Sequence, residues 1–181
     1  MQNNIRESLF RPELLKRIVI YGLLTLLLGS AQCSFFPALS ICPATPDLVM
    51  GMLLAVLLID SEKSAAPLAI GAGFFLDAIG GGAIAYLPVL YTLYVLFVSF
   101  FSQNMLTGFA SYAILLLPTL VFRAIATFIC MALTDGSVPE AAHAFGVILP
   151  ELLCTAIFCL PLYAIVKLCT APMQTHGKFS F

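Results

Sequence analysis

The stretch DLVMGMLLAVLLID, from Asp47 to Asp60, places twelve uncharged, almost wholly apolar residues between two aspartates. As a helix, twelve residues measure about 18 Å at 1.5 Å per residue, whereas the hydrocarbon core of a bilayer is about 30 Å thick. The helix therefore either extends past both aspartates, which then lie near the lipid headgroups, or enters and leaves the membrane on one side. We favour the first alternative, because the polar stretch 61–64 (Ser-Glu-Lys-Ser) then forms a tight turn into the next span.

The composition is that of a membrane protein. The chain has 181 residues, of which 61% are hydrophobic and only 9% are charged, whereas about 25% of the residues of a soluble domain are charged. Because the apolar residues form long runs, we predict an all-α integral membrane protein. The net charge of −1 does not suggest a nucleic-acid partner. The six cysteines form no CxxC motif and no Cys/His cluster, so we predict no metal and no cofactor.

The apolar runs predict a domain of about six transmembrane helices over residues 18–169. A basic segment, 1–17, precedes it and either lies on the membrane surface or forms a solvated tail, and a short tail, 170–181, follows it. Pro150 and Pro161 are expected to kink the last helix. The predicted spans are 18–39, 48–59, 65–79, 84–101, 109–133 and 142–169.

The distribution of basic residues predicts the orientation of these spans. Seven of the eight Lys and Arg residues fall in the N-terminal segment, the turn at 61–64 and the C-terminal end of the chain, which all lie on one side if there are six spans. The opposite loops carry none. Because basic loops stay in the cytoplasm, we expect both termini to be cytoplasmic and the protein to lie in the cytoplasmic membrane of a bacterial cell.

Two of the charged residues inside predicted spans are expected to pair. Arg123 lies ten residues before the end of the fifth span, and Glu151 lies nine residues after the start of the sixth. Both are therefore about 14–15 Å below the outer surface on sequential helices. An unpaired charge at that depth is costly, so an Arg123–Glu151 ion pair is the favourable arrangement. The pair either docks the two helices or acts as a polar lock or relay.

Asp77 is a third charged residue within a predicted span. Steps of four residues back from it give Gly73, Ala69 and Ala65, a stripe of small residues on one helix face. Such a stripe permits close approach of another helix, which is either a partner's or one of this chain's own. The glycines at 80–82 interrupt the helix next to Asp77. The carboxylate is expected either to accept hydrogen bonds from the freed backbone and the next helix start or to bind a partner or ligand.

The remaining polar residues carry weaker signals. Tyr86, Tyr91 and Tyr94 are expected to be interfacial and packing residues of the fourth span. His143 is expected to be a solvated loop residue. We find no paired carboxylates, Ser/His arrangement or metal cluster within the spans. Of the two histidines, His143 lies at the outer edge of the sixth span and His176 lies in the C-terminal tail. We therefore expect no catalytic site and a function other than catalysis.

Two short motifs, together with the architecture, resemble those of a known family. Pro46-Asp47-Leu48 opens the short apolar segment, and Gly73-Phe74-Phe75-Leu76-Asp77 precedes the glycine-rich break. With the basic N-terminus and the charged turn between them, these segments resemble MreD, the small multispan protein of the bacterial rod-shape machinery. The matching residues are confined to about 46–90.

The resemblance implies a non-enzymatic membrane subunit that supports side-wall peptidoglycan synthesis and cell shape. Its implied partners are an MreC-like protein, the MreB filament, a SEDS glycosyltransferase and a class B penicillin-binding protein. The family is also similar in fold to the six-helix substrate-binding subunits of energy-coupling-factor (ECF) vitamin transporters, and such a subunit is the alternative function. We prefer the interaction protein because the predicted outer loops offer few polar groups for a solute.

Overall fold

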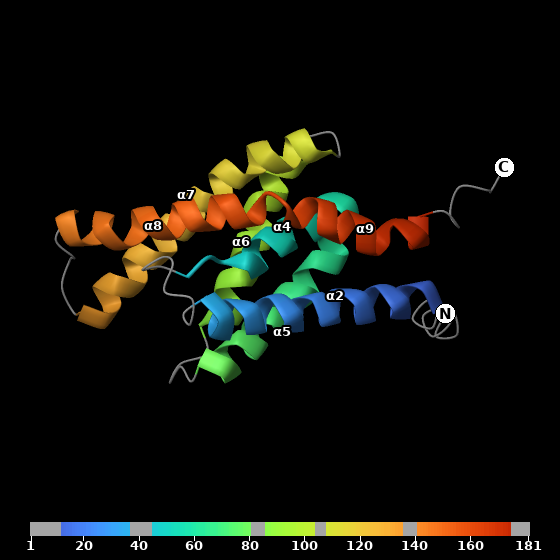
Figure 1. Cartoon of the computed structure of the whole chain (residues 1–181), viewed down its shortest axis with the longest axis horizontal. Coiled ribbons are helices and arrows are strands. Elements are labelled where there is room, and N and C mark those ends of the chain that lie inside the picture. Colours follow the sequence, from blue (N-terminus) through green and yellow to red (C-terminus); the bar gives the residue numbers. More distant parts are fainter. Residues whose placement is uncertain (1–11, 37–44, 81–85, 104–107, 136–140, 175–181) are drawn as a thin grey trace.

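The structure is a computed structural model that describes residues 12–36, 45–80, 86–103, 108–135 and 141–174 (Figure 1). All regular secondary structure in these ranges is helical. The helices are α2 (Pro12–Ser30), the π-helical segment η1 (Ala31–Phe35), α4 (Leu48–Ile59), α5 (Glu62–Gly80), α6 (Leu87–Ser102), α7 (Phe109–Asp135), α8 (Ala141–Cys159) and α9 (Leu162–Gln174). With α2–η1 and α8–α9 each taken together, the described chain forms six helical segments.

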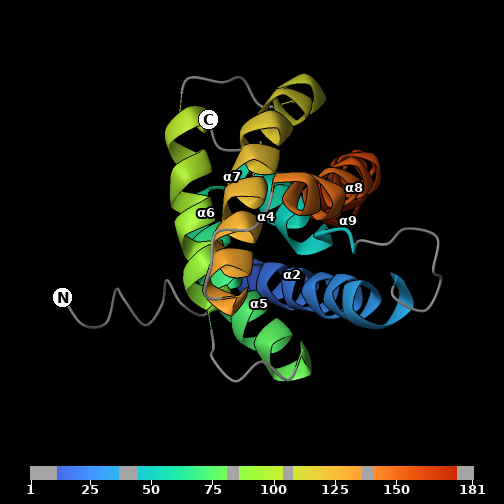
Figure 2. The same ribbon diagram turned by 90° about the vertical axis from the view of Figure 1, so that its left-hand side faces the viewer.

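Helix α4 is the centre of the fold. Every other α-helix of the described part packs against it, and both views place it among them (Figure 1, Figure 2). All of its residues from Leu48 to Leu58 are buried. A helix that is apolar all round is stable when it is surrounded on every side. The short apolar run is therefore the core of the molecule.

The expectation that this helix extends past both aspartates is wrong. α4 begins directly after Asp47, whose backbone is not helical, and it ends at Ile59. The first backbone N–H groups of a helix have no acceptor within the helix. Here Asp47 Oδ1 accepts a hydrogen bond from Met50 N at 3.1 Å, and Gln32 Oε1 accepts one from Leu48 N at 3.1 Å. Neighbouring side chains thus supply hydrogen-bond acceptors for the start of α4 inside the protein.

Helices α5 and α6 pack as a close hairpin, and the stripe of small residues on α5 is buried inside the protein. Ala65, Ala69 and Gly73 are buried. A Cβ atom added to Gly73 would lie only 2.3 Å from the Cα of Pro88 on α6, so the backbones touch at this point. Of the two alternatives for the stripe, packing against this chain's own helices is the one found.

Two helical runs are long and apolar enough to cross a membrane, judged by length and composition. They are Phe109–Leu133 in α7 and His143–Thr170 across α8 and α9, and three further apolar helices are shorter. Large apolar side chains are exposed along α2, α6, α7 and α8, for example Leu27, Phe100, Leu117 and Phe145. These outward faces are those expected of helices in contact with lipid.

Several predicted helix boundaries differ from those found. α2 starts at Pro12, so part of the predicted surface segment belongs to the first helix, while 1–11 lie outside the described residues. The last predicted span is divided into α8 and α9, which are separated at Leu160 and Pro161. Proline lacks the N–H that would continue the helical hydrogen bonds. Pro150, by contrast, lies inside α8.

We predict that Gly73→Ala destabilises the protein and that Gly71→Ala does not. The added methyl at position 73 meets the backbone of Pro88, which cannot rotate away, so the free energy of unfolding should fall by about 1–3 kcal/mol. Gly71 has no atom within 4 Å of its added Cβ and serves as the matched control. Thermal unfolding in detergent measures both variants. Equal melting temperatures would contradict the close contact.

Candidate functional site: a buried guanidinium between two carboxylates

Arg123 on α7 and Glu151 on α8 form an ion pair, which confirms the prediction from their matching depths. Arg123 Nε donates to Glu151 Oε1 at 2.7 Å, and Nη2 lies 2.6 Å from the same oxygen. Thr127, one helical turn after Arg123, donates to the other oxygen, Oε2, at 3.1 Å. Both oxygens of this carboxylate therefore receive hydrogen bonds from α7.

Asp47 is the third member of the cluster, and the sequence did not predict it there. Its Oδ2 lies 3.1 Å from Arg123 Nη1, and its side chain is completely buried. Other helices enclose Asp47, because α4 is internal and begins within the helix packing. Asp47 caps α4 and pairs with Arg123 at the same time. Pro46, directly before it, is also buried.

Further polar side chains surround Asp47. The Tyr91 hydroxyl of α6 donates to both carboxylate oxygens, at 3.2 and 3.3 Å. The Asp47 backbone N–H donates to the Thr155 hydroxyl of α8 at 3.1 Å. Tyr91 was expected only to pack. The length of α4 is the sequence signal that could have identified this site. A helix of twelve residues is about 18 Å long, which is shorter than the hydrocarbon core of about 30 Å, so its two capping aspartates cannot both lie at the headgroups.

The cluster contains one positive and two negative side chains. A buried carboxylate is costly unless it is paired and hydrogen-bonded. Asp47 is stabilised further by the partial positive charge at the start of α4. Glu151 shares the guanidinium of Arg123 with Asp47 and also accepts a hydrogen bond from Thr127 within α7. Arg123 is therefore the one basic side chain between two carboxyl groups in this cluster.

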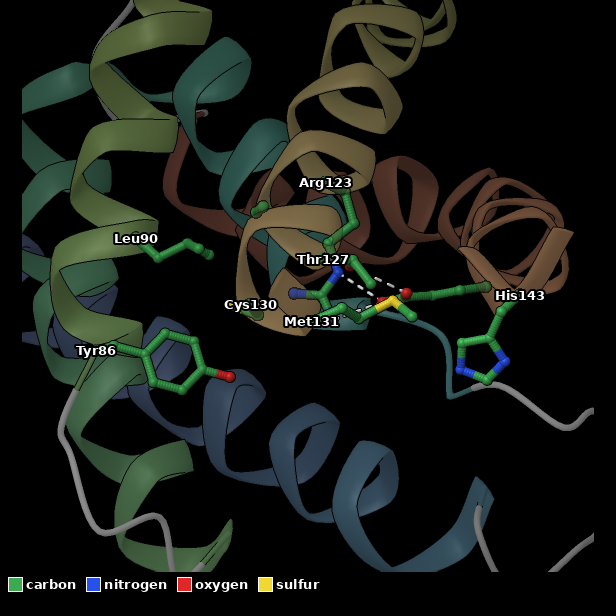
Figure 3. Close-up of a pocket in the computed structure, with 9 residues that line it drawn as sticks. Tyr86, Leu90, Arg123, Thr127, Cys130, Met131 and His143 are labelled. Carbon is green, nitrogen blue, oxygen red and sulfur yellow. Dashed lines mark hydrogen bonds and ion pairs between the residues drawn. The ribbon is translucent and has the colours of Figure 1, made fainter. Parts of the chain in front are cut away.

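A cavity of about 350 Å³ adjoins the cluster between the start of α6, α7 and α8 (Figure 3). Arg123 retains 19% of its side-chain exposure and lines this cavity. Tyr86, which precedes α6, is directed toward the cluster from the opposite wall, and His143 lies at the far side (Figure 3). His143 is exposed as expected, although it belongs to α8 and not to a loop. The complete lining is Tyr86, Leu90, Arg123, Ala126, Thr127, Cys130, Met131, His143 and Glu151.

Asp77 has a separate structural role. Its Oδ2 accepts a hydrogen bond at 3.1 Å from the backbone N–H of Leu87, the first residue of α6. This is the helix-start contact that the sequence predicted as one alternative. Because Gly73 on the same helix also touches α6, Asp77 and Gly73 together fix the α5–α6 joint. Gly81 and Gly82 lie outside the described residues.

A second ion pair lies at the other end of α4. Arg17 Nη1 of α2 contacts Asp60 Oδ1, and a smaller cavity of about 270 Å³ adjoins the pair. Asp60 Oδ2 is buried and has no hydrogen-bond partner among the described residues. Both ends of the central helix thus carry an aspartate paired with an arginine from another helix. In the described part of the chain, no three His, Cys, Asp or Glu residues are placed to hold a metal ion.

We predict that Arg123→Leu is the most destabilising single substitution in the cluster. It leaves two buried carboxylates without their cation, at a cost of about 3–5 kcal/mol in the free energy of unfolding. Glu151→Gln should cost less, because Arg123 keeps Asp47 and the amide oxygen can still accept. Adding Asp47→Asn and Glu151→Gln to Arg123→Leu should recover part of the loss. Melting temperatures in detergent give the ranking, and a triple variant less stable than Arg123→Leu would contradict the charge argument.

Comparisons with known proteins do not identify a family for this chain. No protein-family model, no curated protein and no solved structure matches it. The resemblance to MreD therefore rests on the motifs at Pro46–Leu48 and Gly73–Asp77.

Proposed function

We propose that this protein is a non-enzymatic subunit of the bacterial rod-shape complex, located in the cytoplasmic membrane, where it binds an MreC-like protein. The observation that carries the proposal is the position of the two motifs of the resemblance. Asp47 starts the buried central helix and pairs with Arg123. Gly73 and Asp77 join α5 to α6. A family whose members act as structural subunits would need residues that hold the helices together in this way.

The polar cluster around Arg123 also fits a subunit that acts by binding other proteins. The described polar groups of the cluster bind one another and a helix start. The outward faces of α2, α6 and α7 carry large exposed apolar side chains. In lipid, helices associate through close packing and interhelical hydrogen bonds. Such faces are suited to lipid and to the single transmembrane helix of a partner.

The partner helix must dock on an exposed face, because the small residues of α5 that point inward are already covered. The opposite face of α5 carries Ile70, Gly71 and Phe74, all exposed. Gly71 forms a shallow depression in the surface between these two large side chains, because a Cβ atom added to it would have no neighbour within 4 Å. We place the contact with the MreC-like helix on this face. MreB, a SEDS glycosyltransferase and a class B penicillin-binding protein complete the proposed assembly.

The proposed topology is six spans with both termini in the cytoplasm. Two observations support it. The start of α2 and the end of α9 lie on the same side of the molecule, and the α7–α8 end lies on the opposite side (Figure 1). The basic residues are grouped in the segments expected on the first of these sides.

A substrate-binding subunit of an ECF-type vitamin transporter is the second candidate. The cavity beside Arg123 favours it, since its volume of about 350 Å³ falls within the range of small-molecule sites. Such a subunit would co-purify with an ATPase module and bind a vitamin. The rod-shape subunit would instead co-purify with the MreC-like protein, so one affinity purification from the native membrane separates the two candidates.

We predict that Gly71→Leu weakens partner binding without unfolding the protein. A leucine at this exposed position prevents close approach of the partner helix. The variant should be as abundant as the unmodified protein, should recover less MreC-like protein on purification, and should yield rounded cells. Gly73→Leu is the matched comparison, and its clash with Pro88 should lower abundance instead. Undiminished recovery with Gly71→Leu would exclude this face of α5.

We predict opposite locations for reporters placed after Ser180 and near Gly136. Six spans put the first in the cytoplasm and the second outside. Labelling of single cysteines introduced at the two positions in intact cells gives the same comparison. An external reporter after Ser180 would contradict the topology.

A further inference from the structure

The cavity beside Arg123 combines apolar walls with two polar groups that donate hydrogen bonds. Its walls come from the start of α6, from α7 and from α8. The apolar surface is supplied by Leu90, Ala126 and Met131, and the donors are the Arg123 guanidinium and the Tyr86 hydroxyl (Figure 3). A mostly apolar space with a few convergent polar groups is the usual form of a small-molecule site.

Arg123 has N–H groups that its two carboxylate partners do not use. A guanidinium carries one N–H on Nε and two on each terminal nitrogen. Glu151 Oε1 lies 2.7 Å from Nε and 2.6 Å from Nη2, and Asp47 Oδ2 lies 3.1 Å from Nη1. One N–H of Nη1 and one of Nη2 therefore have no acceptor among the described residues. Because the carboxylates take up the other sides of the guanidinium, these N–H groups are left for the cavity, which Arg123 lines.

Tyr86 supplies a second donor from the opposite wall. It directly precedes α6, it is 47% exposed, and its hydroxyl is directed across the cavity toward the cluster (Figure 3). This hydroxyl makes no hydrogen bond to another described residue. Donors thus approach the space from both walls, and an acceptor placed between them would satisfy both.

The charges of the cluster favour an acceptor without net charge. Asp47 and Glu151 already offset the positive charge of Arg123, so an anion would gain little from the guanidinium and would meet two carboxylates. A cation would find no free carboxylate oxygen in the lining, because Glu151 accepts hydrogen bonds at both oxygens. A carbonyl oxygen is uncharged and has two lone pairs, so it can accept from Arg123 and Tyr86 together. The apolar walls suit the carbon substituents of such a group.

We propose that this cavity binds the carbonyl group of an uncharged, largely apolar molecule between Arg123 and Tyr86. The carbonyl belongs either to a free small molecule or to the acyl ester of a membrane lipid. The proposal is independent of the MreC-like partner, since the cavity lies beside α6, α7 and α8 and the proposed partner contact lies on α5.

The test uses the full chain, purified in detergent, and four phenyl compounds of similar shape. Acetophenone carries a carbonyl, α-methylstyrene replaces its oxygen by a methylidene carbon, benzoate is an anion and benzamidine is a cation. We expect acetophenone to raise the melting temperature and to bind about tenfold more tightly than each of the other three, with binding referred to the concentration of each probe in the micelle. Equal binding of acetophenone and α-methylstyrene, tighter binding of benzoate or benzamidine, or binding of none would overturn the proposal.

A variant at the exposed Tyr86 locates the carbonyl without disturbing the buried cluster. Tyr86→Phe removes the hydroxyl and keeps the ring, so it should weaken acetophenone binding about fivefold and leave α-methylstyrene binding unchanged. Ala126→Phe fills the cavity and should abolish the binding of both probes. Acetophenone binding that is unchanged in Tyr86→Phe would overturn the assignment, whether or not Ala126→Phe folds.

Nanodiscs of ester and ether phospholipids with the same headgroup separate the two sources of the carbonyl, because ether lipids have none. If a lipid ester occupies the site, ester nanodiscs should give a higher melting temperature and weaker acetophenone binding than ether nanodiscs. If the ligand is a free molecule, acetophenone should bind equally in both. Absence of acetophenone binding in ether nanodiscs would contradict a carbonyl site, because no lipid carbonyl competes for it there.

Discussion

The contact between Arg123 and Asp47 is the interaction on which the rest of the structure depends. Asp47 is the cap of α4, and α4 is packed against all the other α-helices of the described chain. A carboxylate that is completely buried at the centre of such a bundle requires a cation and hydrogen-bond donors. Arg123 provides the cation, and Tyr91 and Met50 provide donors. The start of α4, the early part of α6 and the middle of α7 are thereby brought to one point.

The burial of α4 explains the distribution of polar and apolar side chains over the molecule. Because the central helix supplies apolar surface in every direction, the helices around it can face it with small or polar residues. The hydroxyls of Tyr94 and Tyr112 donate to the carbonyls of Met50 and Gly51, each at 3.2 Å. Large apolar side chains then remain on the outside, as at Leu117 on α7. Exposed apolar faces of this kind suit a lipid environment.

The α5–α6 joint and the cluster around Arg123 leave different surfaces of the molecule available. At the α5–α6 joint, Gly73 and Asp77 are occupied by contacts to α6, so they hold the hairpin and leave the outer face of α5 free. At the cluster, Arg123 remains partly exposed to a cavity. The outer face of α5 and the cavity beside Arg123 are therefore separate surfaces of the molecule.

The sequence by itself determined the helical class, the order of the helical segments and the Arg123–Glu151 pair. Apolar runs must be helical where they meet lipid, and charges at equal depth on sequential helices must pair to be tolerated. For Asp77 it left two alternatives, and the contact with the next helix start is the one found. Only the tertiary structure decided where Asp47 lies, because the choice between headgroup and interior depends on whether other helices enclose α4. The same holds for the small-residue stripe: Ala65, Ala69 and Gly73 permit close approach equally to any helix, and only the packing of α6 against α5 selects which one fills that space.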